Sequence, residues 1–278
     1  MKNLNSSSIF VSAKTKKGLI VMNKGFLKEI IYRIDYLYLP DDLFEKFYSL
    51  LFSEFQEKLN RFKQINIAPD NKNTSSLEKA YVLSNENEFT TLTISRSFIR
   101  LSAKLRQKSR IQYNNWVARI VKTIKDNELK FVFKKIEIRK NNKFFIESKH
   151  FKNIKDIFKT DFSYDDIQDM QIDYMDNKQI YKNNNAYFAI FTKATAGILS
   201  NKSLKLNDVN ANLIQFDYAY YSDDEQICFN LIKSPVAFLK NVQQVIYDRF
   251  TKMINEDVLK YIDSASGIYD KYKIILID

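Results

Sequence analysis

The chain is poor in glycine, proline, cysteine and histidine, and each shortage narrows the chemistry open to it. Its 278 residues include 4 Gly, 3 Pro, 1 Cys and 1 His. So few glycines argue against phosphate-cradling loops, and no P-loop, G-x-S-x-G or G-x-G-x-x-G pattern occurs. The single histidine, His150, cannot build a histidine-rich metal site, and no cysteine cluster assists it. We therefore expect neither a metal nor another cofactor.

The lone cysteine, Cys228, excludes an intrachain disulfide and fits a reducing, cytoplasmic setting. Its neighbours Ile227 and Phe229 predict an apolar strand, and hence a buried, inert thiol rather than a nucleophile paired with His150. No signal-peptide stretch opens the chain, and no apolar run approaches the roughly 20 residues of a membrane span. We expect a cytoplasmic protein without a membrane partner.

Positive charge is plentiful and is concentrated in the middle of the chain. Lys and Arg total 44 against 33 Asp and Glu, a net charge of +11. Residues 93–149 hold 16 of these cations and only 4 acids, so this segment alone carries +12. A charge excess of this size indicates an anionic partner, with nucleic acid first and an acidic protein second. Six aspartates follow within 160–177, and we interpret them as the acidic face of a helical region over about 151–175.

Hydrophobic periodicity predicts an α+β fold, with a mainly antiparallel sheet and three substantial helices packed on it. The helices are expected over about 41–62, 112–126 and 235–262, where apolar residues recur at spacings of three and four. Alternation predicts strands near 28–38, 79–84, 88–101, 185–194, 211–221 and 226–233, and a hairpin of 131–139 and 143–148. A break in the second of the two strands before the middle helix, at Ser95–Ser97, indicates a turn or bulge.

The organisation we expect is a polar lead-in over residues 1–25 followed by a single α+β domain over 26–278. Two subdomains within that domain would meet near 150–180. No strict internal repeat is visible, only a loose echo of strand, helix and strands over 28–101 and again over 88–148.

Several short motifs in this order resemble a sporadically distributed bacterial family of unknown function. Ser97–Leu101 matches its strand ending, Tyr113-Asn114-Asn115-Trp116 its Tyr-x-x-Trp helix, and Phe250–Asn255 its late helix. Its Leu-Arg-Tyr-Ile-Asn strand is matched only at Arg139 and Asn142, with Lys140 in place of the tyrosine. Patchy distribution in such a family implies mobile elements, and hence antiviral defence, counter-defence or toxin–antitoxin roles.

A non-enzymatic binding protein is the function we expect. Its partner, nucleic acid or an acidic protein, would meet the cations of the basic segment, six in a run and three at the expected hairpin tip. These are Arg96, Arg100, Lys104, Arg106, Lys108 and Arg110, then Arg139, Lys140 and Lys143. Such a density of Arg and Lys suits phosphate contacts.

Two alternatives stay open. Glu147-Ser148-Lys149 forms the E-x-K pattern of Mg²⁺-dependent nucleases, in which an upstream acid, here Asp126 or Glu137, would complete the metal site. A structural or assembly subunit is the other alternative, with the basic segment of one copy meeting the acidic stretch of a second in a homodimer.

Overall fold

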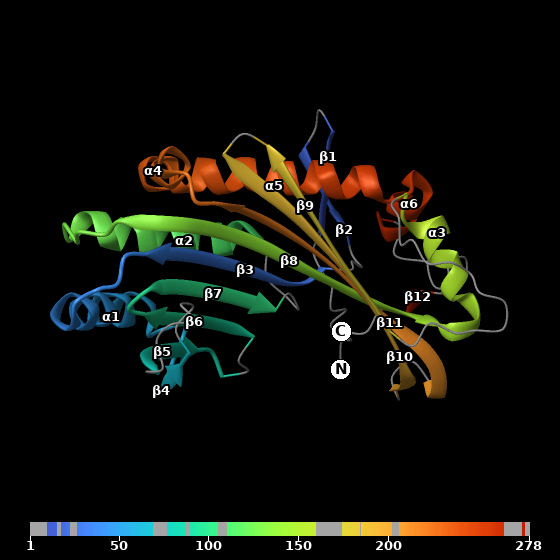
Figure 1. Ribbon diagram of the computed structural model, residues 1–278, viewed down its shortest axis with the longest axis horizontal. Helices are drawn as coiled ribbons and strands as arrows, with labels where there is room; N and C mark the ends of the chain where they lie inside the picture. The colour runs from blue at the N-terminus through green and yellow to red at the C-terminus, as the bar shows by residue number, and fades with distance from the viewer. Residues whose placement is uncertain are drawn as a thin grey trace.

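The computed structural model describes residues 10–15, 18–22, 27–68, 77–86, 89–104, 110–159, 174–183, 185–201, 206–263 and 274–275. Ten strands form one antiparallel sheet (Figure 1): β3 (Leu27–Tyr36), β4 (Arg61–Ile67), β5 (Glu78–Ser84), β6 (Thr90–Ser95), β7 (Phe98–Lys104), β8 (Phe133–Glu147), β9 (Tyr174–Asn183), β10 (Ala186–Asn201), β11 (Leu206–Ser222) and β12 (Ile274–Ile275). Strands β1 (Phe10–Thr15) and β2 (Gly18–Met22) form a separate hairpin.

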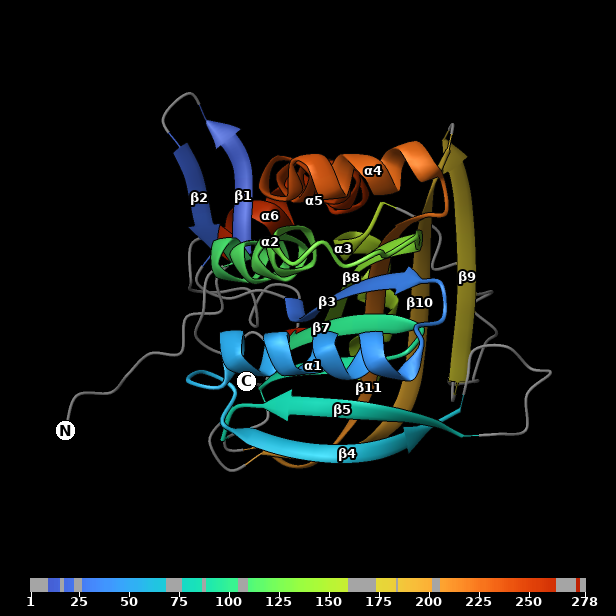
Figure 2. The ribbon, with the colours of Figure 1, turned by 90° about the vertical axis from the view of Figure 1, so that its left-hand side faces the viewer.

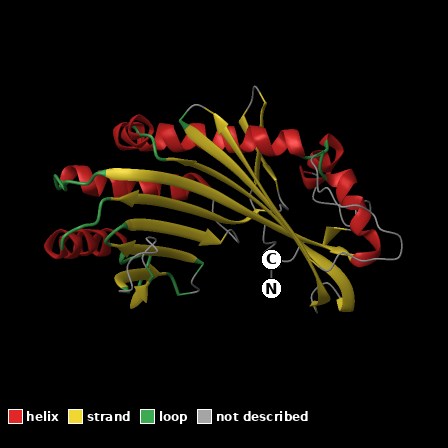
Figure 3. Cartoon of the chain, viewed as in Figure 1, coloured by secondary structure: helices red, strands yellow, loops and turns green. Residues whose placement is uncertain are grey.

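The helices are α1 (Asp41–Phe55), α2 (Arg110–Asp126), α3 (Ile154–Ile157), α4 (Glu225–Lys233), α5 (Pro235–Met253) and α6 (Glu256–Asp263), with a 3₁₀ segment, η1, over Ser148–Asn153. The predicted α+β class, with its mainly antiparallel sheet and three substantial helices, is confirmed (Figure 3). None of the helices described has the length and apolar character needed to cross a membrane.

The two halves of the sheet have the same order of strands from the centre to the edge. Its order is β4-β5-β6-β7-β3-β8-β11-β10-β9, with β12 added beside the end of β8. The first unit runs β3, α1, the meander β4–β7 and α2, and the second runs β8, η1 with α3, the meander β9–β11, and α4 with α5. In each unit the last meander strand pairs with the first strand, and β3 pairs with β8 between the units. The second unit thus starts at residue 133, not at 88 as the sequence echo indicated.

One face of the sheet holds the hydrophobic core, and strand alternation explains which residues reach it. In β3, Ile30, Tyr32, Ile34 and Tyr36 are all buried, as their alternation predicted. The strand predicted near 28–38 ends at Tyr36, and Tyr38, which lies beyond it, is 60% exposed.

Helices α1, α2, α3, α4 and α5 pack on this same face, and α6 contacts β2. Aromatic contacts join three of the helices to the sheet. Phe47 of α1 contacts Tyr36 of β3, and Phe250 of α5 contacts Tyr218 of β11. Phe158, the residue after α3, contacts Phe144 of β8. Figures 1 and 2 show α5, α2 and α1 lying one above another in that order.

A buried hydrogen-bond network ties the two units together. The Tyr32 hydroxyl donates to Asn114 Oδ1 over 2.8 Å, and Gln243 Nε2 donates to both of these oxygens, over 2.6 and 2.7 Å. These side chains come from β3, α2 and α5, and each is at most 8% exposed. The network satisfies polar groups inside an otherwise apolar core.

The first helix is shorter than predicted. It ends at Phe55, and β4 begins at Arg61, because the chain turns to pair with β5. Phe62, which we assigned to the helical stripe, lies in β4 opposite Leu83.

The predicted hairpin over 131–148 is wrong, because residues 133–147 form the single long strand β8. Its two asparagines do not turn the chain, since neighbouring strands bind their amides. Asn141 Nδ2 donates to Glu29 of β3 over 2.7 Å, and Asn142 Nδ2 donates to the Phe216 carbonyl of β11 over 2.7 Å.

Two further elements differ from prediction. Residues 225–233 are helix α4, not a strand, because Asp224 caps the helix by accepting from the Ile227 amide over 3.0 Å. Cys228 is buried as expected, and burial raises the pKa of its thiol to about 11. The acidic helix expected over about 151–175 is not continuous: α3 ends at Ile157, β9 begins at Tyr174, and 160–173 lie outside the described residues.

Candidate nucleic-acid interface

The sheet face opposite the helices, called the open face from here on, collects polar, cationic and aromatic side chains. Directly opposed residues of an antiparallel pair place their side chains on the same face, so the strand register defines rows that cross the sheet. One such row, the tyrosine row, runs from β7 to β9 through Arg100, Arg33, Glu137, Tyr221, Tyr187 and Lys182.

A second row, the Phe191 row, crosses the same six strands and is displaced from the tyrosine row by four residues of β8. It runs through Lys104, Glu29, Asn141, Asp217, Phe191 and Lys178. Both rows therefore begin and end on a cation. With neighbouring strands ~4.8 Å apart, each row spans roughly 24 Å.

The carboxylates of the open face are engaged by neighbours on the same face. Glu29 accepts from Ser102 Oγ over 3.0 Å as well as from Asn141. Glu137 pairs with Lys135 and Arg139, at 3.4 and 3.0 Å. Local contacts of this kind offset the negative charge within the face.

Five exposed cations of this face form no salt bridge with a carboxylate among the described residues. They are Arg100, Lys104, Lys143, Lys178 and Lys182. They stand on β7, β8 and β9 and surround the engaged carboxylates. The open face thus offers an outside partner mainly positive charge.

Aromatic rings alternate with these cations on the β8–β9 half of the face. Tyr187 and Tyr221 stack with ring centroids 5.0 Å apart and an interplanar angle of 8°. Lys135 Nζ lies 5.1 Å from the Tyr221 centroid, and Lys182 Nζ lies 5.6 Å from that of Tyr187. The stack therefore has a cation at each end.

Phe191 is flanked in a similar way. The Arg139 guanidinium lies 5.1 Å from its ring centroid and Lys178 Nζ lies 5.4 Å from it. Beyond it, Lys193 Nζ is 4.9 Å from the ring of Tyr174, which is 55% exposed.

Asp217 is the most buried acid of the open face, with 4% of its surface exposed. Burial raises the pKa of its carboxyl group, although hydrogen bonds from Gln215 and the Asn142 amide and the charges of Arg139 and Lys143 lower it in part. A raised pKa means that Asp217 resists ionisation more than an exposed aspartate does.

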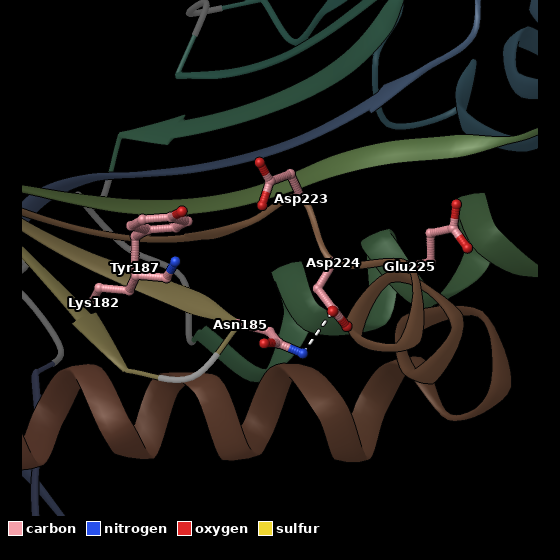
Figure 4. Close-up of a pocket in the computed structure, with 6 residues that line it drawn as sticks. All are labelled: Lys182, Asn185, Tyr187, Asp223, Asp224 and Glu225. Atoms are coloured by element: carbon pink, nitrogen blue, oxygen red, sulfur yellow. Dashed lines mark hydrogen bonds between the residues drawn. The ribbon is translucent and has the colours of Figure 1, made fainter.

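An open pocket of ≈ 440 Å³ lies at the end of the tyrosine row, where Lys182 and Tyr187 meet the loop that enters α4 (Figure 4). The loop contributes Asp223 and Asp224, and Glu225 is the first residue of α4. Asp224 accepts from Asn185 Nδ2 over 2.7 Å besides capping α4. With three carboxylates on one wall, this corner repels phosphate and bounds the positive region.

The structure brings four of the sequence-predicted cations to the open face: Arg100, Lys104, Arg139 and Lys143. Arg96 instead pairs with Asp41 and donates to the Tyr38 hydroxyl at the β6–β7 turn. Arg106 and Lys108 lie outside the described residues, as does the side chain of Arg110, which begins α2.

The prediction that Lys140 lies at a hairpin tip is wrong. It lies in the middle of β8 on the helix-covered face and is only 2% exposed. Even and odd residues of a strand point to opposite faces, so Arg139 and Lys140 cannot serve one surface.

Glu147 and Lys149 of the E-x-K pattern lie close together, but neither of the acids predicted to complete the metal site, Asp126 or Glu137, lies near them. Lys149 Nζ lies 2.8 Å from Glu147 Oε2. Glu137 is ten residues away on the same strand, ~33 Å at the usual rise, and Asp126 ends α2 in a pair with Lys122. No group of three or more His, Cys, Asp or Glu side chains within the described ranges is arranged to hold a metal.

Sequence reasoning missed the half of the open face that lies outside the basic segment. Its members are Arg33, Lys178, Lys182, Lys193, Tyr187, Phe191 and Tyr221. The odd-numbered positions of 185–194 and 211–221 carried the signal, because strand alternation separates them from the core residues. Only the sheet order shows that β11 pairs with the basic strand β8 and that β10 follows β11.

No protein-family model matches the chain, and no curated protein sequence matches it. The resemblance to a sporadically distributed bacterial family stays a prediction.

Proposed function

We propose that the protein binds nucleic acid through the open face, without catalysing a reaction. The observation that carries the proposal is a set of exposed cations that pair with no carboxylate among the described residues, on a sheet face to which no described helix packs. Arg100 and Lys143 come from the basic segment and Lys178 from β9. Phosphate groups would give these side chains the anionic partners that the described residues do not supply.

The arrangement of charge supports a binding site on the open face rather than one formed by the basic segment, residues 93–149, alone. Side chains of that segment point to both faces of the sheet, as Arg139 and Lys140 do. Cations from three separate strands converge on one face instead, and a polyanion can contact all of them at once. A role in mobile-element conflict is what the family resemblance implies for the biological setting.

A salt-titrated binding assay tests the proposal. The test variant is the triple Arg100→Ala, Lys143→Ala and Lys178→Ala. Each phosphate contact contributes about −0.7 to −0.9 to the slope of log K against log salt, so losing three should reduce that slope by about two to three. Fluorescence anisotropy with labelled single-stranded and duplex oligonucleotides measures it.

A matched control separates position from net charge. Lys46, Lys125 and Lys240 are exposed on α1, α2 and α5, away from the open face. Their triple Ala variant loses the same charge and should keep the parent's slope. Equal losses in the two triple variants, or no binding by the parent protein at low salt, would overturn the proposal.

A further inference from the structure

The aromatic side chains of the open face indicate which kind of nucleic acid binds there. This inference rests on the proposed function. Tyr187, Tyr221 and Phe191 are partly exposed, on neighbouring strands β10 and β11. A purely electrostatic surface does not need rings in the middle of its cationic rows. Rings left partly in water on a sheet face are a ready platform for a flat ligand.

Ring and cation repeat as a unit on this half of the sheet. By ring and cation contacts, one series is Lys135, Tyr221, Tyr187 and Lys182, and the other is Arg139, Phe191 and Lys178. Each unit offers a stacking surface and a positive charge within about 6 Å of each other. A nucleotide presents the complementary pair, a flat base and a phosphate.

Duplexes and single strands differ in which of these groups they expose. In a duplex the base faces are stacked on one another, so a protein reaches only phosphates, sugars and base edges. In a single strand the base faces are free to stack on aromatic side chains. An acidic protein would engage the cations but supplies no regular series of flat rings.

We infer that the β8–β11–β10–β9 half of the open face binds single-stranded nucleic acid. In the structure Lys135 and Lys182 lie over the outer faces of the Tyr187–Tyr221 pair, and Arg139 and Lys178 lie over Phe191. When bases stack on these rings, the cations move off the ring faces, and Lys178, Lys182 and Arg139 contact the phosphates. The three carboxylates at the α4 entrance border the path of the strand at the end of the tyrosine row. Stacking reads no sequence, so the preference is for strandedness rather than for a base order.

The test compares three probes of equal length: a 12-nucleotide oligothymidine, its duplex with oligoadenine, and an abasic deoxyribose-phosphate 12-mer. The abasic strand keeps the phosphates and removes the bases. We expect the parent protein to bind oligothymidine tightest of the three. Oligouridine of the same length serves as the RNA arm and distinguishes RNA from DNA as the source of the single strand.

The decisive variant is Tyr187→Ala with Phe191→Ala, which removes two rings and leaves every cation. Its binding to oligothymidine should fall about tenfold for each ring lost, while its binding to the abasic strand stays within twofold of the parent's. Tyr181→Ala with Phe229→Ala is the matched control, because those rings are 51% and 53% exposed and lie off the open face. Tyr187→Phe keeps the ring and should bind like the parent. Thermal unfolding of each variant shows that it is folded.

The outcomes separate the two proposals. Selective loss of oligothymidine binding in the ring variant, with the abasic strand unaffected, supports the inference. Equal affinity of the parent for single strand and duplex, or an unchanged ring variant, overturns the inference and leaves nucleic-acid binding standing if the Arg100, Lys143 and Lys178 variant is weakened. Absence of binding to every probe at low salt overturns both.

Discussion

At the residue scale, the chain uses polar side chains in two distinct ways. Tyr32, Asn114 and Gln243 satisfy one another inside the core, whereas Glu29, Asn141 and Asp217 connect strands on the open face. The first set fixes how α2 and α5 pack on β3. In the second set, hydrogen bonds to neighbouring strands offset the negative charge of the acids, which would otherwise repel an anionic partner. The cost of removing a member therefore differs between the sets.

Asn114 is the shared acceptor of the core network, so its replacement by Ala should destabilise the protein by about 1–3 kcal/mol. The loss leaves the Tyr32 hydroxyl without its acceptor in a buried site and removes one of the two acceptors of the Gln243 amide. Urea unfolding measures the change in the free energy of unfolding. Asn115→Ala, at the exposed neighbouring position on α2, should stay within about 0.5 kcal/mol of the parent; similar losses for both would contradict the network's role.

Asp217 should make stability fall as pH rises. Burial raises its folded-state pKa above the unfolded value of about 3.9, so the folded state holds the proton more tightly between those two values. The stabilisation is complete below the unfolded pKa and is lost as the pH increases through the folded pKa.

Unfolding measured from pH 3.5 to 7 in the parent and in Asp217→Asn checks this expectation. The variant cannot ionise at this position, so its advantage over the parent should grow with pH and vanish near pH 3.5. A difference that does not change with pH would show that Asp217 titrates normally.

At the element scale, buried polar contacts decide where strands begin, turn and continue. Glu78, at the start of β5, accepts from the backbone amides of Arg96 and Ser97 and from Ser97 Oγ, the last over 3.0 Å. This carboxylate holds the β6–β7 turn that the sequence predicted at Ser95–Ser97. The turn leads directly into Arg100 on β7.

Replacing Glu78 with Ala should cost about 1–3 kcal/mol and speed amide hydrogen exchange at Arg96 and Ser97, because both amides lose their acceptor. Glu86→Ala serves as the control, since Glu86 is exposed in the turn before β6. Unchanged exchange at the two amides in Glu78→Ala would contradict the anchoring role.

Elements with a strong apolar period were predictable, whereas the course of β8, which polar contacts with neighbouring strands support, was not. The stripes that include Phe44 and Trp116 gave the start of α1 and nearly all of α2, because one face of each helix is apolar, but the first stripe was extended past the end of α1 at Phe55. Residues 140–142 resembled a turn by composition, yet β3 and β11 bind their amides and keep β8 straight. A single sequence does not show which strands will lie on either side of an asparagine.

At the scale of the whole molecule, the two similar units share one sheet and one core. The β3–β8 pairing, the packing of α2 against α5 and the Tyr32–Asn114–Gln243 network all cross between them. We therefore expect the units to unfold in one cooperative transition, in line with the predicted single domain.

Two native probes test that expectation without labels on other residues. Trp116 lies in the first unit and Cys228 in the second, and both are buried. Tryptophan fluorescence and thiol reactivity, followed along one urea titration, should give coincident midpoints. Thiol exposure at clearly lower urea than the fluorescence change would show that the second unit opens separately.

The sequence by itself determined the fold class, the helical stripes, the core face of the alternating strands near 28–38 and 211–221 and the excess of positive charge. These properties depend on residues close together in the chain, whose spacing sets the face on which each side chain lies. Only the tertiary structure decided that cations of β7, β8 and β9 share the open face with the rings of β10 and β11. The reason is that sheet order and register join residues far apart in sequence, and a shift of one residue would move Arg139 to the core and Lys140 to the open face.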